Sequence, residues 1–168
     1  MFYSTKLFDG YSSCFRQYKA DHSHCRFIHG YALSFKVTFV GTLDERNWVC
    51  DFGSFKRNGT KKMLKYFFDH TLIVAEDDPL IVHFEDLENF KLVQLRILPS
   101  VGCERFAEFV YQLITYQLFH DEMTQGRVFV KSVECMEHDK NSAIYLDDTI
   151  EHDIRNNNTL TREIRVID

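Results

Sequence analysis

The segment at residues 103–120 constrains the fold most, because its apolar side chains recur at the spacing of one helix face. Phe106, Phe109, Val110, Leu113 and Ile114 are related by spacings of three and four residues, which places them on a single stripe. A stripe of this kind must be buried against another layer of the protein. The sequence therefore predicts a long amphipathic helix whose apolar face forms part of the core.

The remaining regular elements are predicted from strand-like alternation and from amphipathic spacing. In order they are strands at 4–19 and 31–42, a helix at 52–68 interrupted near 58–59, a short helix after 79, an extended segment at 92–98, and strands at 128–134 and 142–146. A loop at 20–30 joins the first two strands. This order predicts an α+β fold in which an antiparallel sheet carries two main helices on one face.

Composition limits the classes of protein to consider. The chain has 168 residues, 45% of them hydrophobic, and a net charge of −5, so we predict one globular domain at 1–148 with a polar tail at 149–168. The charge disfavours nucleic acid as a partner. No apolar run approaches the roughly 20 residues of a membrane span, and no signal peptide is recognisable at the start. Five irregularly spaced cysteines disfavour a disulfide framework, so we expect reduced thiols and a cytoplasmic location.

Reactive side chains are densest between the first two predicted strands. His22, His24, Cys25 and His29 lie within eight residues, and their side chains are of the types that zinc prefers, while Cys25 is also a candidate nucleophile or acid/base. A histidine is, however, more often a surface or core residue than a ligand.

Three further candidates lie at the ends or in the middle of other elements. The Asp69-His70 pair follows a predicted helix and offers a proton relay, although His70 can simply pack at the helix end. Glu104 falls in the first turn of the long helix, where the dipole stabilises its charge. Glu134 lies in the middle of a strand, so it is either exposed or available to a ligand.

Five short motifs in a fixed order resemble the 6-pyruvoyltetrahydropterin synthase and 6-carboxytetrahydropterin synthase family. The resemblance runs from about residue 7 to 146. It rests on Cys25 followed by His29-Gly30-Tyr31 in place of the family's His-Gly-His, on Val49–Lys56 (VCDFGSFK), on Asp69-His70, on Glu104, and on Glu134 followed by Tyr145.

This resemblance implies a fold, a substrate and a set of roles. It implies a tunnelling-fold subunit assembled into a barrel-like homo-oligomer, usually a hexamer, with active sites between subunits. The implied substrate is 7,8-dihydroneopterin triphosphate, from which the family eliminates triphosphate and rearranges or cleaves the side chain. Glu134 and Glu104 would hold the pterin ring, whereas Cys25, Asp69 and His70 would transfer protons. The product branch, related to queuosine, biopterin or folate, is left open.

The metal site departs from the family pattern. The family holds zinc with three His, one on the first strand and two in His-Gly-His, and of these only His29 remains here. The first-strand position, counted back from Cys25, falls on Cys14. Two alternatives follow: His24 or His22 completes a zinc site with Cys14 and His29, or the site works without metal and Arg16 or Tyr31 polarises the substrate oxygen.

Two wider questions also remain open at this point. The chain could be a non-catalytic pterin- or purine-binding oligomer that has lost the three-His zinc site, instead of a lyase. In addition, the stretch at 75–98 is longer than the link common in the family, and it could reshape the mouth of the pocket, form a subunit contact, or be a surface insertion without function.

Overall fold

The computed structural model describes residues 1–121, 124 and 126–150. Its elements in chain order are β1 (Phe2–Phe15), the short 3-10 helix η1 (His24–Arg26), β2 (His29–Gly41), α1 (Ser54–Arg57), α2 (Thr60–Phe68), β3 (Thr71–Ala75), α3 (Ile81–Asn89), β4 (Leu95–Leu98), α4 (Cys103–Phe119), β5 (Val128–His138) and β6 (Asn141–Leu146). Within this part of the chain, no helix is long and apolar enough to span a membrane. The predicted tail lies outside the described residues from residue 151 onward.

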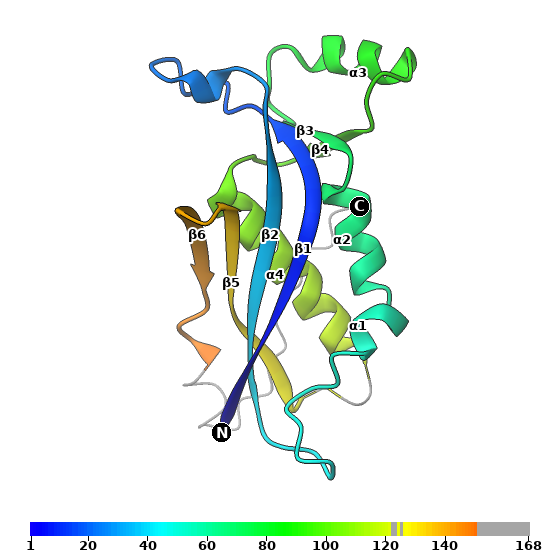
Figure 1. The fold of residues 1–168 in the computed structure, drawn as a ribbon, viewed down its shortest axis with the longest axis vertical. Coiled ribbons are helices and arrows are strands. Elements are labelled where there is room, and N and C mark those ends of the chain that lie inside the picture. The colour runs from blue at the N-terminus through cyan, green and yellow to red at the C-terminus, as the bar shows by residue number, and fades with distance from the viewer. Residues whose placement is uncertain (122–123, 125, 151–168) are drawn as a thin grey trace.

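The strands form one curved sheet in the order β4-β3-β1-β2-β5-β6 (Figure 1). The pairs β1–β2, β2–β5 and β5–β6 are antiparallel, as predicted, but β3 lies parallel to β1, and β4 lies parallel to β3. The α+β class is therefore confirmed, and the sheet is mixed. Strand β3 was not predicted because all five of its residues are buried, and a fully buried strand lacks the alternation that marks a half-exposed one.

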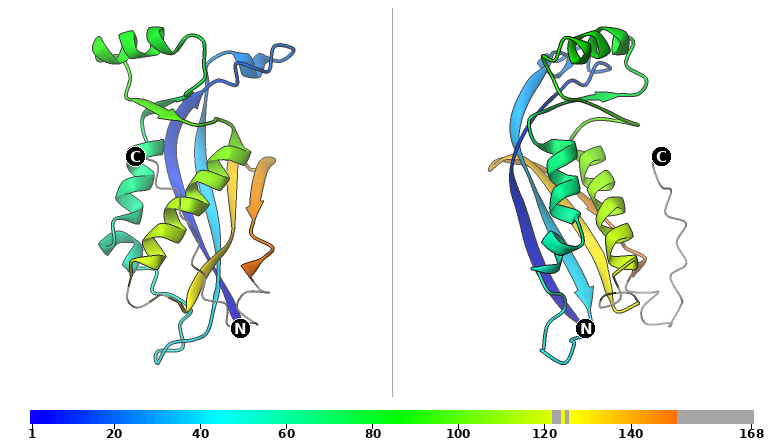
Figure 2. Two further views of the ribbon diagram at one scale, coloured as in Figure 1. Left: turned by 180° about the vertical axis from the view of Figure 1, so that it is seen from behind. Right: turned by 90° about the vertical axis from the view of Figure 1, so that its right-hand side faces the viewer.

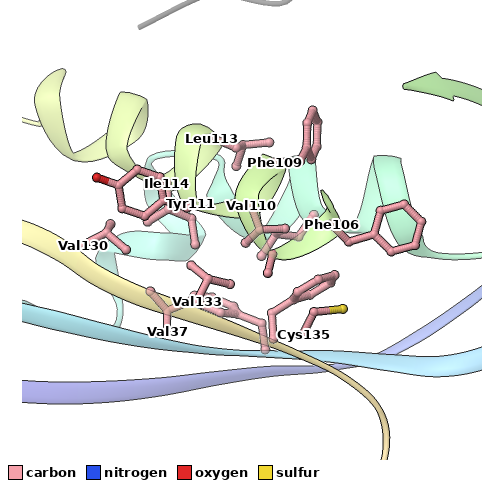
Figure 3. Packing of buried hydrophobic residues seen from close by; sticks show 14 of the residues in the cluster. Val37, Phe106, Phe109, Val110, Tyr111, Leu113, Ile114, Val130, Val133 and Cys135 are labelled. Atoms are coloured by element: carbon pink, nitrogen blue, oxygen red, sulfur yellow. The ribbon is translucent and has the colours of Figure 1, made fainter. Parts of the chain in front are cut away.

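Helices α1, α2 and α4 all lie on one face of the sheet, as the right-hand view of Figure 2 shows. The stripe predicted on α4 is buried: Phe106, Val110 and Ile114 have no exposed surface. In Figure 3 this stripe packs against Val37 of β2 and Val133 of β5. The hydrophobic core is thus the layer between α4, α2 and the helix-covered face of the sheet.

The predicted interruption of the first helical region is the boundary between α1 and α2. Gly59 has φ of +88°, a conformation that side chains with a Cβ rarely adopt, and the Asn58 Oδ1 accepts hydrogen bonds from the Thr60 N–H at 3.1 Å and from its hydroxyl at 2.8 Å. Because nothing lies within 4 Å of a Cβ built at Gly59, the backbone alone restricts this position.

We therefore expect Gly59→Ala to reduce the free energy of unfolding by about 1–2 kcal/mol, the cost of the left-handed conformation for an L-residue. Urea denaturation followed by circular dichroism measures it. Lys61→Ala, an exposed change in the same helix, is the control and should alter stability by less than about 0.5 kcal/mol. A neutral or stabilising Gly59→Ala would contradict the assigned backbone conformation.

Candidate functional site

Side chains from four elements meet at one end of the sheet. The end of β1, the start of β2 and the end of β5 lie there next to the start of α4 (Figure 1). Phe15 and His29 are register partners on β1 and β2, and the side chains of Phe15, His29 and Tyr31 share the helix-covered face. The ring centroids are 4.9 Å apart for Phe15–His29, 5.9 Å for Phe15–Tyr31 and 5.3 Å for His29–Tyr31. We call these three side chains the ring cluster.

The structure corrects the first-strand position of the expected metal site. Counting back from Cys25 selected Cys14, but Tyr11, Ser13 and Phe15 are the residues of β1 that alternate toward the helices. Cys14 belongs to the opposite face, where its Sγ donates to the Thr71 carbonyl at 3.6 Å. The residues just before Cys25 form a loop, so counting back through them as if they were strand gave a position one residue too early. Because successive strand residues point to opposite faces, that position lies on the wrong face of the sheet.

The ring cluster does not fit a zinc ion. Phe15 has no donor atom, and burial, followed by the charge of Glu137, raises the pKa of Tyr31, which opposes its conversion to a phenolate ligand. Of the three, only His29 has an atom suited to bind a metal. Its Nδ1 lies 2.7 Å from the Phe27 carbonyl, to which it can only donate, so the Nε2 of the neutral ring keeps its lone pair.

The other histidines do not repair the site. His24 is exposed, and His22 is 84% exposed and pairs with Asp21 at 3.6 Å. Across residues 1–121, 124 and 126–150, no three His, Cys, Asp or Glu side chains are arranged to hold a metal ion. The predicted set of Cys14, His29 and His24 is therefore not brought together.

The strand carboxylate predicted from the sequence lies on the wrong face. Glu134 pairs in register with Lys36 and Ile144 on the side of the sheet without helices, and its Oε1 accepts a hydrogen bond from the Ser142 hydroxyl at 2.7 Å. Glu104 is in the first turn of α4, on the helix-covered side, and is exposed. Glu134 and Glu104 therefore cannot grip one ring within this chain.

Glu137, three residues beyond Glu134, lies on the helix-covered face. Val133 and Cys135 are buried on the helix-covered face, and Glu137 continues this alternation. The contact with Cys103 and burial raise the pKa of Cys135 most, and the charges of Glu137 and Glu104 raise it further, so both carboxylates lie near the same buried thiol. The alternation from Val133 was visible in the sequence and would have identified Glu137.

Cys25 lies in the loop that leads into the ring cluster. It is half-buried in η1, its carbonyl accepts a hydrogen bond from the Gln17 N–H at 2.8 Å, and it contributes to the raised pKa of Tyr31. The loop is anchored through Arg16, whose Nε and Nη2 donate to the two oxygens of Asp78, both at 2.8 Å. Arg16 is thus paired with Asp78, whereas Tyr31 lies in the ring cluster.

The long stretch at 75–98 therefore has a structural role beside the site. It contains α3, which lies at the same end of the molecule as the loop at 16–28 (Figure 2), and it supplies Asp78, whose side chain is fully buried. Phe84 of α3 also lies under the Arg16 guanidinium, 5.6 Å from it. The segment holds the base of the loop that carries Cys25.

We expect Asp78→Asn to lower the free energy of unfolding by about 2 kcal/mol, because it leaves a mostly buried guanidinium without its counter-charge. The figure is below that of a fully buried pair because Arg16 keeps 17% of its side chain exposed. Chemical denaturation measures the change, and faster amide hydrogen exchange at 17–28 locates it. Asp77→Asn, which breaks the exposed pair with Lys19, should change stability much less, because solvent screens that pair. Equal effects of the two variants would contradict the anchoring role.

Asp69 and His70 form the expected pair, but apart from Cys25. The His70 Nδ1 lies 2.8 Å from the Asp69 Oδ1, and the His70 N–H donates to the Ser12 carbonyl at 2.6 Å. Burial works to raise the pKa of Asp69, but hydrogen bonds from His70 and the Ser12 backbone outweigh it and hold the pKa below its usual value. His70 lines an open groove of about 550 Å³ with Ser12 and Cys14 on the face without helices. In the described chain no hydrogen bond joins this pair to Cys25.

Comparisons with known proteins identify the family of the chain. The family model described as 6-pyruvoyl tetrahydropterin synthase matches residues 6–148. The 6-carboxy-5,6,7,8-tetrahydropterin synthase of Rickettsia typhi is 32% identical over 117 residues, which cover 67% of this chain and 78% of that protein.

Solved structures share the fold. An uncharacterized protein from Wolinella succinogenes superposes with a TM-score of 0.69 at 21% identity, covering 88% of this chain and 98% of its own. The 6-pyruvoyl tetrahydropterin synthase of Caenorhabditis elegans superposes with a TM-score of 0.58 at 18% identity, covering 87% of this chain and 95% of its own. The predicted tunnelling fold is confirmed, and the chain belongs to the 6-pyruvoyl tetrahydropterin synthase family.

Proposed function

We propose that the protein is a lyase that acts on the side chain of a dihydropterin, with 7,8-dihydroneopterin triphosphate or a close relative as substrate. The observation that carries this proposal is the family match over residues 6–148, within which the chain keeps the candidate thiol Cys25 and the Asp69-His70 pair. The name of the Rickettsia relative favours 6-carboxytetrahydropterin as the product.

Glu137 and Glu104 are proposed to hold the pterin ring. A carboxylate accepts two parallel hydrogen bonds, and the ring offers an amino group beside a ring N–H in that arrangement. Both residues lie near the buried pair of Cys103 and Cys135, next to the ring cluster. A ring held there has its side chain directed along the cluster and toward Cys25.

The proton-transfer set is proposed to form between copies of the chain. Cys25 lies at the ring cluster, whereas His70 opens on the other face of the sheet, so one chain does not assemble them. A homo-oligomer brings the Asp69-His70 pair of one copy to the Cys25 of another. We propose the hexamer that the family resemblance implies, in a cytoplasm whose reducing conditions suit the free thiols of all five cysteines.

The direct test is incubation of the purified protein with 7,8-dihydroneopterin triphosphate. We expect triphosphate release and a tetrahydropterin product, identified by mass spectrometry, and we expect Cys25→Ala to bind the ring without turnover. The alternative of a non-catalytic binding module predicts saturable binding with no triphosphate release by the wild type. That result would overturn the lyase proposal, which the family membership and the retained Cys25 favour.

A further inference from the structure

The ring cluster lies where the family resemblance puts three zinc-binding histidines. Only one of its three side chains is a histidine, and this changes how the site can act on a substrate. Phe15 contributes a phenyl ring, Tyr31 a phenol and His29 an imidazole, with centroids 4.9–5.9 Å apart. Phe106 of α4 packs edge-on against Phe15 at 5.0 Å, and His138 lies 6.2 Å from Tyr31. The three side chains therefore belong to a packed aromatic surface and not to a vacant coordination sphere.

We infer that this site works without a bound metal and that the Tyr31 hydroxyl donates a hydrogen bond to an oxygen of the substrate side chain. The inference rests on the proposed function, since it assigns a contact within the same site. A metal would polarise that oxygen by accepting its lone pair, and a neutral phenol does so more weakly by hydrogen bonding.

Tyr31 is the residue placed for this contact. It is half-buried between Phe15 and His138, and Cys25 and Glu137 both lie close enough to act on it electrostatically. A ring gripped by Glu137 would therefore extend its side chain past the Tyr31 hydroxyl on the way to Cys25. Arg16 is held away from this role by the bidentate pair that its Nε and Nη2 form with the buried carboxylate of Asp78.

The metal half of the inference is tested by zinc content, which does not depend on turnover. Wild-type protein produced with zinc in the medium and purified without chelator should contain far less than one zinc per chain by mass spectrometry. The double variant Phe15→His/Tyr31→His should bind about one zinc per chain, because it supplies two imidazoles beside His29. Cobalt substitution of the double variant should give the absorption of a tetrahedral site.

Two results would overturn the metal half. One is about one zinc per chain in the wild type that disappears in His29→Ala. The other is a folded double variant that binds no zinc, since it would show that the three positions do not converge. Native circular dichroism and an unchanged oligomeric state establish that the double variant is folded.

The hydrogen-bond half is tested by binding with two probes. Tyr31→Phe should weaken the binding of 7,8-dihydroneopterin, which carries side-chain hydroxyls, by about tenfold, the loss of one hydrogen bond in a partly buried site. The binding of 7,8-dihydropterin, which lacks the side chain, should be unchanged. Equal effects on both probes would overturn the contact. Because binding is measured without turnover, this test can be interpreted even if the protein shows no lyase activity.

Discussion

A mixture of Cys25→Ala and His70→Asn proteins should recover about one quarter of wild-type turnover after subunit exchange, although each variant alone should lose at least about a hundredfold. The recovery follows from the proposed site, since Cys25 does not line the groove that His70 lines in one chain. In a closed ring of randomly mixed subunits, one site in four joins an intact Cys25 to an intact His70 from the neighbour. Asn is the chosen replacement because His70 has φ of +59°, which Asn tolerates.

The exchange is made by partial denaturation and reassembly, and native mass spectrometry confirms mixed oligomers. Cys25→Ala mixed with the double variant Cys25→Ala/His70→Asn is the matched control, and it should remain inactive because no intact Cys25 is present. Mixed oligomers of the two single variants that show no recovery would contradict a site shared between copies. They would instead place the complete proton-transfer set within one chain.

Local patterns in the sequence predicted the parts of the fold that local interactions decide. The stripe on α4 and the break at Gly59 were predicted because helix spacing and backbone restriction act within a few residues. The parallel strand β3 was not predicted. Burial on both faces removes the alternation that marks a strand, and that burial comes from packing against residues distant in the sequence.

The site was predicted less well because it depends on which face each side chain takes. Cys14 lies one residue from Phe15, and Glu134 lies three residues from Glu137, the carboxylate that the proposed site uses. An odd shift reverses the face of a strand residue. On β5, the buried Val133 and Cys135 continue by alternation to Glu137 and not to Glu134. For β1, the strand pairing was needed to show which face each side chain takes, because the loop before Cys25 is not part of the strand.

Glu137→Gln should weaken binding of a pterin ring by between about tenfold and a hundredfold, whereas Glu134→Gln should change it by less than about twofold. In the first variant an amide replaces one acceptor oxygen by an NH₂ group, which faces the ring N–H donors instead of accepting from them. In the second, the changed side chain lies beside Lys36 and Ser142 on the opposite face of the sheet. The two substitutions are chemically identical and lie on the same strand. A difference between their effects on pterin binding therefore shows which face of the sheet binds the ring.

Quenching of pterin fluorescence measures both dissociation constants, and thermal denaturation shows whether either variant is unfolded. The opposite order, with Glu134→Gln the damaging change, would mean that the ring binds on the face without helices, next to His70 and the open groove. The ring cluster would then have no substrate to contact, and the position of Tyr31 would be irrelevant to the reaction. The pair of glutamate variants therefore decides on which side of the sheet this protein carries out its chemistry.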